Sequence, residues 1–419
     1  MCMRQPSSRL FTNEISSSPA GAAARRRLPI SVPSPPLSPL RPRREWVAHM
    51  PVSSYQLYKS QLLVAYLSFT TTAAFSDQLG MSTVAVPSPA PTVSDDAESL
   101  RKALQGNASC LLDLFFLGWR ADKGALIEIL CRRTAAQRAA IRRAYAFLYR
   151  EPLLNCFRNR LSRHCRLISV DFWRAMIFWT MDPAERDANL VHEALKRQKD
   201  ENYTLVLVEV SCASTPDHLM AVRDFYRNLF GCSVEEDVAS STALREPLKK
   251  MLVSLVTSYR YAGENVDMDV AKLEAAQLAE AIREKQPHGN EIARIISTRN
   301  KAQLRATFQR YKEEYGTDIV EDVNSHCRGK FARMLKSAVW CLTSPEKHFV
   351  EVIRHSILGL GTYEDMLTRV IVSRAEIDMK QIKEEYKAKY KSSVTGDVTG
   401  DTSFSYRDML LALVGKEEP

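Results

Sequence analysis

Four segments of this 419-residue chain resemble one another, and this internal repetition constrains the fold more than any other feature. Each segment can be aligned on a tyrosine, and consecutive tyrosines are 81, 85 and 75 residues apart: Tyr145, Tyr226, Tyr311 and Tyr386. Sixteen residues before each tyrosine stands Ile or Val, and eleven residues before three of them stands Thr or Asn, which are common helix N-caps. The pattern indicates a tandem repeat whose units bury their apolar faces against one another.

Local signals predict that each repeat is helical. Thr134 and Asn300 are followed three residues later by Gln137 and Gln303, as a capping box requires, and Pro216 suits a first helical turn. The apolar spacing in residues 349–358 and 404–414 predicts further helices at the unit ends. We therefore predict an all-α fold.

Only residues 204–210 have the composition of a strand, and they occupy a helix position in their repeat. We place the domain boundaries as follows: a disordered Pro/Ser/Arg-rich extension at 1–92, and repeats at 93–179, 180–260, 265–343 and 344–415. The first repeat contains an insertion at 107–118, which we interpret either as retained intron sequence or as an apolar loop that enters a bilayer.

The net charge of +9 is concentrated at the N-terminus. Residues 1–80 hold nine Lys/Arg and only Glu14, Glu45 and Asp77 as acids, so the remaining 339 residues carry about +3. The repeats therefore do not have the charge of a dedicated polyanion binder, and we expect no nucleic-acid partner. The basic extension has the composition of a transit peptide, and a second interpretation is that translation starts at Met81.

A short glycine motif marks the candidate site. Residues 358–362 read Leu-Gly-Leu-Gly-Thr, and Asp401 follows after 38 intervening residues. Glycine reaches positive φ without steric penalty, so this loop can turn carbonyl oxygens outward. Together with a bidentate carboxylate, such oxygens are the ligands that Ca²⁺ prefers. We predict a calcium site formed by Ile357, Gly359, Gly361 and Asp401.

Four helical units of about 75 residues, each centred on this pattern, resemble the annexins, and the plant branch is most similar. Further stretches that carry the resemblance are 182–187 (DPAERD), 234–239 (VEEDVA), 302–308 (AQLRATF) and 373–379 (SRAEIDM). The resemblance implies four five-helix repeats in a curved disc whose convex face binds Ca²⁺ and acidic phospholipids. It also implies a cytoplasmic monomer that assembles on the plasma membrane or endomembranes, with a plastid location if the transit peptide is real.

Only the fourth repeat keeps the whole motif. In the first repeat the loop reads Gly118-Trp119-Arg120-Ala121, and Arg160 stands 42 residues after Gly118, where a carboxylate belongs. If Gly118 belongs to the insertion, Gly106 takes its place. At the same position the second and third repeats have Ser241 and His326, which cannot supply a bidentate carboxylate. We therefore expect one intact site in four.

Other functions remain open as alternatives. A calcium-independent scaffold could bind lipid or actin through charge. An enzyme is less favoured: the histidine linked to peroxidase-like activity in some plant annexins is replaced by Arg132, and Asp397–Gly400 resembles a GTP-binding D-x-x-G without any P-loop. Cys212 and Cys341 match a cysteine pair implicated in redox behaviour in plant annexins, with buried, inert thiols as the competing interpretation.

The resemblance also places Asp187, Arg369 and Asp378 at positions that line a central hydrophilic channel in annexins. The arginine expected beside them in the second repeat is replaced by Ser214. We expect these residues to form structural salt bridges between the two halves of the protein.

Overall fold

The computed structural model describes residues 80–106, 121–163, 170–197, 201–283, 289–359 and 361–417, which lie within one compact unit. No strand occurs among these described residues, and the all-α prediction is confirmed. The N-terminal extension up to residue 79 and the insertion at 107–118 lie outside them, so both interpretations of these segments stay predictions.

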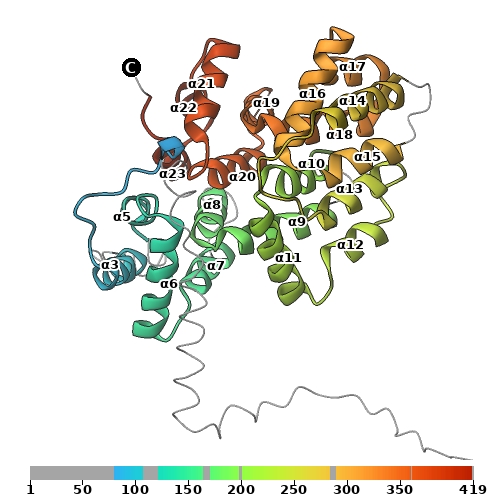
Figure 1. Cartoon of the computed structure of the whole chain (residues 1–419). Coiled ribbons are helices and arrows are strands. Elements are labelled where there is room, and N and C mark those ends of the chain that lie inside the picture. Colours follow the sequence, from blue (N-terminus) through green and yellow to red (C-terminus); the bar gives the residue numbers. More distant parts are fainter. Residues whose placement is uncertain are drawn as a thin grey trace, which may run out of the picture. The chain divides into compact units, whose positions relative to one another are not determined.

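The helices follow one another in groups that correspond to the predicted repeats (Figure 1). The first group comprises α3 (Val93–Gln105), α5 (Lys123–Leu130), α6 (Ala135–Tyr149), α7 (Leu153–Arg163) and α8 (Val170–Thr180). The second comprises α9 (Pro183–Lys196), α10 (Glu201–Val208), the π-helix η1 (Glu209–Ala213), α11 (Pro216–Phe230), α12 (Val234–Ser240) and α13 (Leu248–Thr257). The third comprises α14 (Met268–Arg283), α15 (Gly289–Thr298), α16 (Lys301–Tyr315), α17 (Ile319–His326) and α18 (Gly329–Thr343). The fourth comprises α19 (Pro345–Ile357), α20 (Glu364–Arg374), α21 (Met379–Tyr390), α22 (Val394–Asp401) and α23 (Phe404–Val414).

The predicted caps begin the central helices, with one correction. Thr134 accepts from the backbone N–H of Gln137, whose side chain accepts in turn from the Thr134 N–H, so this capping box forms. Asn300 caps α16 in the same way, but the side chain of Gln303 turns away from it. Gln303 instead binds both the N–H and the carbonyl of Asp267 in the preceding linker, over 2.8 Å each. The second predicted box is wrong because the linker offers this side chain two partners rather than one.

Residues 204–210 are helical, as their place in the repeat predicted. They continue from α10 directly into η1, where the hydrogen bonds shift to the wider i→i+5 pattern. Position in the repeat therefore outweighs the strand-like composition of this segment.

The aligned tyrosines are fully buried, and their hydroxyl groups form a polar cluster in each repeat. In three repeats the hydroxyl donates to an aspartate eleven residues later: Tyr226 to Asp237 (2.5 Å), Tyr311 to Asp322 (2.6 Å) and Tyr386 to Asp397 (2.6 Å). In the first repeat the corresponding partner of Tyr145 is the Cys156 thiol, at 3.6 Å. A buried hydroxyl needs such a partner, so this cluster fixes the distance between two helices of the unit.

Contacts between repeats pair the first with the fourth and the second with the third. Helix α23 packs against α5 and α8, and α20 also packs against α8 (Figure 1). Helices α10 and η1 pack against α18, while α13 packs against α15. The buried guanidinium of Arg138 forms an ion pair with Glu376 over 2.7 Å, and it crosses from the first repeat to the fourth.

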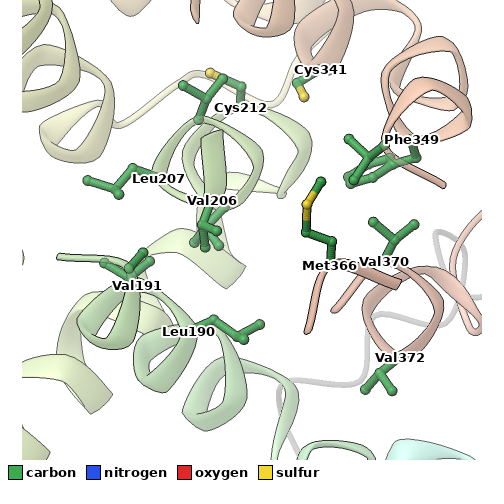
Figure 2. Close-up of a cluster of buried hydrophobic side chains, with 14 of the residues drawn as sticks. Leu190, Val191, Val206, Leu207, Cys212, Cys341, Phe349, Met366, Val370 and Val372 are labelled. Atoms are coloured by element: carbon green, nitrogen blue, oxygen red, sulfur yellow. The ribbon is translucent and has the colours of Figure 1, made fainter. Parts of the chain in front are cut away.

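The apolar core continues where the second, third and fourth repeats meet. Figure 2 shows side chains of α9, α10, α19 and α20 gathered in this region, among them Leu190, Val206, Phe349 and Met366. All four are buried, so the repeats share one core.

Candidate calcium site

The loop between α19 and α20 has the backbone geometry that the glycine motif predicts. Ile357 is the last residue of α19, and Gly359 and Gly361 have φ values of +133° and +102°. No atom lies within 4 Å of a Cβ built on either glycine, so the positive φ, rather than crowding, is what requires glycine. The N–H of Tyr363 donates to the carbonyl of Ser356 over 2.8 Å and closes the loop. Leu360, between the two glycines, lies outside the described residues.

Asp401 lies against this loop, although 39 residues separate it from Thr362. It is the last residue of α22, and the hydroxyl of Thr362 lies 2.5 Å from its Oδ2 and 2.8 Å from its backbone carbonyl oxygen. The threonine therefore holds the carboxylate at the mouth of the glycine loop. The sequence identified the glycines and the aspartate, and the structure adds Thr362 as the residue that joins them.

The donor set suits a hard cation. In the described part of the chain, no three His, Cys, Asp or Glu side chains cluster as a metal site would require. A cation at this loop would therefore take most of its ligands from backbone carbonyls, with one carboxylate, which is chemistry that Ca²⁺ accepts and zinc does not. Burial raises the pKa of the neighbouring Glu364, and the charges of Asp171, Asp365 and Asp401 raise it further.

In the first repeat, a basic side chain stands in place of the carboxylate. Arg160 lies on α7 and donates a 2.5 Å hydrogen bond to the backbone carbonyl of Leu104, near the end of α3. Gly106 follows with φ of +72°. If Gly106 is aligned with Gly359, then Leu104 aligns with Ile357, so the arginine binds the carbonyl that corresponds to a predicted calcium ligand.

The second and third repeats do not provide a carboxylate at this position. Ser241 is buried just after α12, and His326 ends α17 with its Nδ1 3.0 Å from the Asp322 carbonyl oxygen. That the fourth repeat holds the one intact site stays a prediction from these residue types.

The charged residues expected around a central channel are buried among one another. Asp187 contacts Arg186 and His218, each over 2.8 Å, and Arg374 pairs with Asp378 within the fourth repeat. These pairs are each confined to one repeat, contrary to the expected bridges between halves.

One ion pair does cross between repeats. Arg369 binds Glu209 of η1, which also lies 2.9 Å from Nε2 of His348. Asp187, Glu209, Ser214 and Arg369 help to line a cavity of about 250 Å³. Sequence reasoning missed Glu209 and His348, because nothing local connects residues 139 positions apart.

The residues considered for enzymatic functions have structural surroundings. Asp397, from the D-x-x-G stretch, binds Tyr386, Arg354 and Ser392. Cys212 and Cys341 are buried free thiols in the same part of the core (Figure 2), and burial raises the pKa of each. A protonated, buried thiol is a poor nucleophile.

Tandem helical units with a carbonyl-rich cation loop define the class: an all-α repeat protein with a candidate calcium site. No helix in the described ranges combines the length and apolar character needed to cross a bilayer. The Annexin family profile matches residues 95–166, 273–338 and 348–413. Annexin D3 of Arabidopsis thaliana is 41% identical over 342 residues, covering 80% of this chain and 100% of the relative.

Solved structures give the same result. Annexin III superimposes with a TM-score of 0.69 at 26% identity, over 80% of this chain and 98% of its own. A calcium-bound annexin (Sm)1 shares the fold, with a TM-score of 0.64 at 24% identity over 78% of this chain and 91% of its own. The chain belongs to the annexin family and is of the plant type. Annexins bind acidic phospholipid membranes peripherally and in a calcium-dependent manner.

Proposed function

We propose that this protein attaches to acidic phospholipid membranes through one calcium ion held by the fourth repeat. The ligands are the carbonyl oxygens of Ile357, Gly359 and Gly361 and the carboxylate of Asp401. A lipid phosphate oxygen and water complete the coordination shell. Neither the protein nor the lipid alone fills that shell, so calcium and membrane bind together.

The observation that carries this proposal is the pair of hydrogen bonds from Thr362 to Asp401. They place a carboxylate beside two glycines whose φ values turn the loop into a carbonyl-presenting conformation. A site with one carboxylate and an open shell should be weak without lipid, with a Kd on the order of 10⁻⁵–10⁻³ M. The proposal assigns no catalytic residue.

Vesicle co-sedimentation tests the proposal. Wild-type protein should pellet with phosphatidylserine-containing vesicles in calcium and stay in the supernatant in EGTA. Asp401→Asn should remove most of the calcium-dependent fraction while leaving the helical circular dichroism unchanged. Asp408→Asn is the matched control, because Asp408 is an exposed carboxylate on the adjacent helix α23.

Equal sedimentation of wild type and Asp401→Asn at every calcium concentration would reject this site. Binding that is equally strong in EGTA would favour a calcium-independent scaffold instead.

A further inference from the structure

An aromatic side chain projects into solvent beside the candidate calcium loop. Phe404 begins α23 and is 70% exposed, whereas Met409 and Leu410 of the same helix are fully buried. Its φ is +53°, in the left-handed region that a bulky residue occupies only at a cost. The other two described non-glycine residues with positive φ, Arg150 and Lys391, are both helix C-caps, where this conformation is common.

Two hydrogen bonds hold the segment around Phe404 alongside the calcium loop. Thr362 binds Asp401 on one side, and the hydroxyl of Tyr406 donates to the carbonyl of Glu364 over 3.1 Å on the other. Phe404 lies between Asp401 and Tyr406 in sequence, and the half-exposed Tyr363 lies between Thr362 and Glu364. The two segments therefore present an aromatic residue each, from between the same two cross-links.

A third apolar side chain lies on the other arm of the loop. Leu358 is 54% exposed and directly precedes Gly359, whose carbonyl is a predicted calcium ligand. Leu358, Tyr363 and Phe404 therefore surround the place where the coordination shell is open. Any surface that supplies the missing ligands comes within reach of all three.

We propose that Phe404, assisted by Tyr363 and Leu358, enters the interfacial layer of an anionic bilayer when calcium binds the fourth repeat to it. This inference rests on the proposed calcium site. Aromatic rings favour the headgroup level of a membrane, where their apolar body is shielded from water. The strained backbone at Phe404 fits this role, because glycine would relieve the strain but would leave nothing to insert.

Two substitutions test the inference on vesicles of phosphatidylserine and phosphatidylcholine at a fixed calcium concentration. Phe404→Gly should weaken vesicle affinity about threefold to tenfold, as expected for losing part of a buried aromatic side chain. The same variant should be at least as stable to heat as wild type, because glycine suits this φ. Phe147→Ala is the matched control: Phe147 is 71% exposed near the end of α6, away from the calcium loop, and should not change the affinity.

Phe404→Trp supplies a direct readout of insertion. It should keep wild-type affinity, and brominated lipids should quench more of its fluorescence than of wild-type fluorescence, in calcium but not in EGTA. If wild type binds in calcium but Phe404→Gly binds equally well and Phe404→Trp adds no quenched signal, the inference is overturned while the calcium site stands. If wild type does not bind vesicles in calcium, both proposals fail.

Discussion

The guanidinium of Arg160 lies 2.5 Å from the carbonyl oxygen of Leu104, where it satisfies a backbone acceptor that the loop would otherwise offer to a cation. A fixed positive charge thus takes in the first repeat the role that we assign to calcium in the fourth. The arginine is always protonated, so this arrangement is independent of the calcium concentration.

We predict that restoring calcium binding in the first repeat requires several simultaneous changes. Arg160→Glu should act only together with Arg120→Gly, Ala121→Thr and deletion of residues 107–118, because the loop as well as the carboxylate departs from the motif. The combined variant should bind one more calcium ion in calorimetry than wild type. Arg160→Glu alone should bind no more, and Arg158→Glu on the same helix controls for the reversed charge. An unchanged stoichiometry in the combined variant would mean that the first repeat fails for another reason.

The hydroxyl of Thr362 should contribute to calcium affinity without itself being a ligand. Thr362→Val keeps the shape of the side chain but removes both hydrogen bonds to Asp401. A carboxylate that is no longer held in place should raise the calcium Kd in the presence of vesicles about threefold to tenfold, the loss expected for one or two hydrogen bonds. Thr399→Val removes an exposed hydroxyl from the same helix as Asp401 and should leave the Kd unchanged. Equal affinities of the two variants would contradict the positioning role.

The tyrosine clusters should differ in their contribution to stability. Tyr386 donates to Asp397, and burial and this carboxylate raise the pKa of Tyr386 to about 12, so it remains a donor at physiological pH. Tyr386→Phe should lower the free energy of unfolding by about 1–3 kcal/mol, because the buried carboxylate loses a partner. Tyr145→Phe should cost less, since its partner Cys156 is a weakly bonding thiol. Urea unfolding measures both, and equal losses would contradict the comparison.

Asp187 should make the fold sensitive to acid. Burial by itself would raise the pKa of this carboxyl, but Arg186 and His218 outweigh burial and hold the pKa well below its usual range. A carboxyl whose pKa falls on folding stabilises the protein above its unfolded pKa of about 3.9, and this contribution is lost as the pH falls below that value. Asp187→Asn should therefore lower stability at pH 7, by about 3 kcal/mol if the buried arginine loses its partner.

Urea unfolding between pH 7 and pH 3 tests this expectation. The stability gap between wild type and Asp187→Asn should narrow toward pH 3. Asp217→Asn, at an exposed position in the first turn of α11, should run parallel to wild type throughout. A gap that stays constant with pH would show that Asp187 acts through packing rather than charge.

The sequence predicted those features that depend on local order. The four helical units, the caps at Thr134 and Asn300 and the glycine loop all follow from residues a few positions apart. Asp401 was found because the repeat fixes its distance from the loop. Glu209 and His348 were missed because their contact depends on how repeats pack, and Phe404 was missed because a backbone angle leaves no trace in residue type.

The pairing of the first repeat with the fourth also bears on how the chain is made. The surface of α5 and α8 that α20 and α23 cover is complete only when the last residues of the protein are available. During synthesis the ribosome releases the first repeat long before them, so that repeat must wait with its apolar face open. The second and third repeats follow one another directly and can pair at once. A chain truncated before α19 should therefore form a stable middle pair and expose its first repeat to chaperones and proteases.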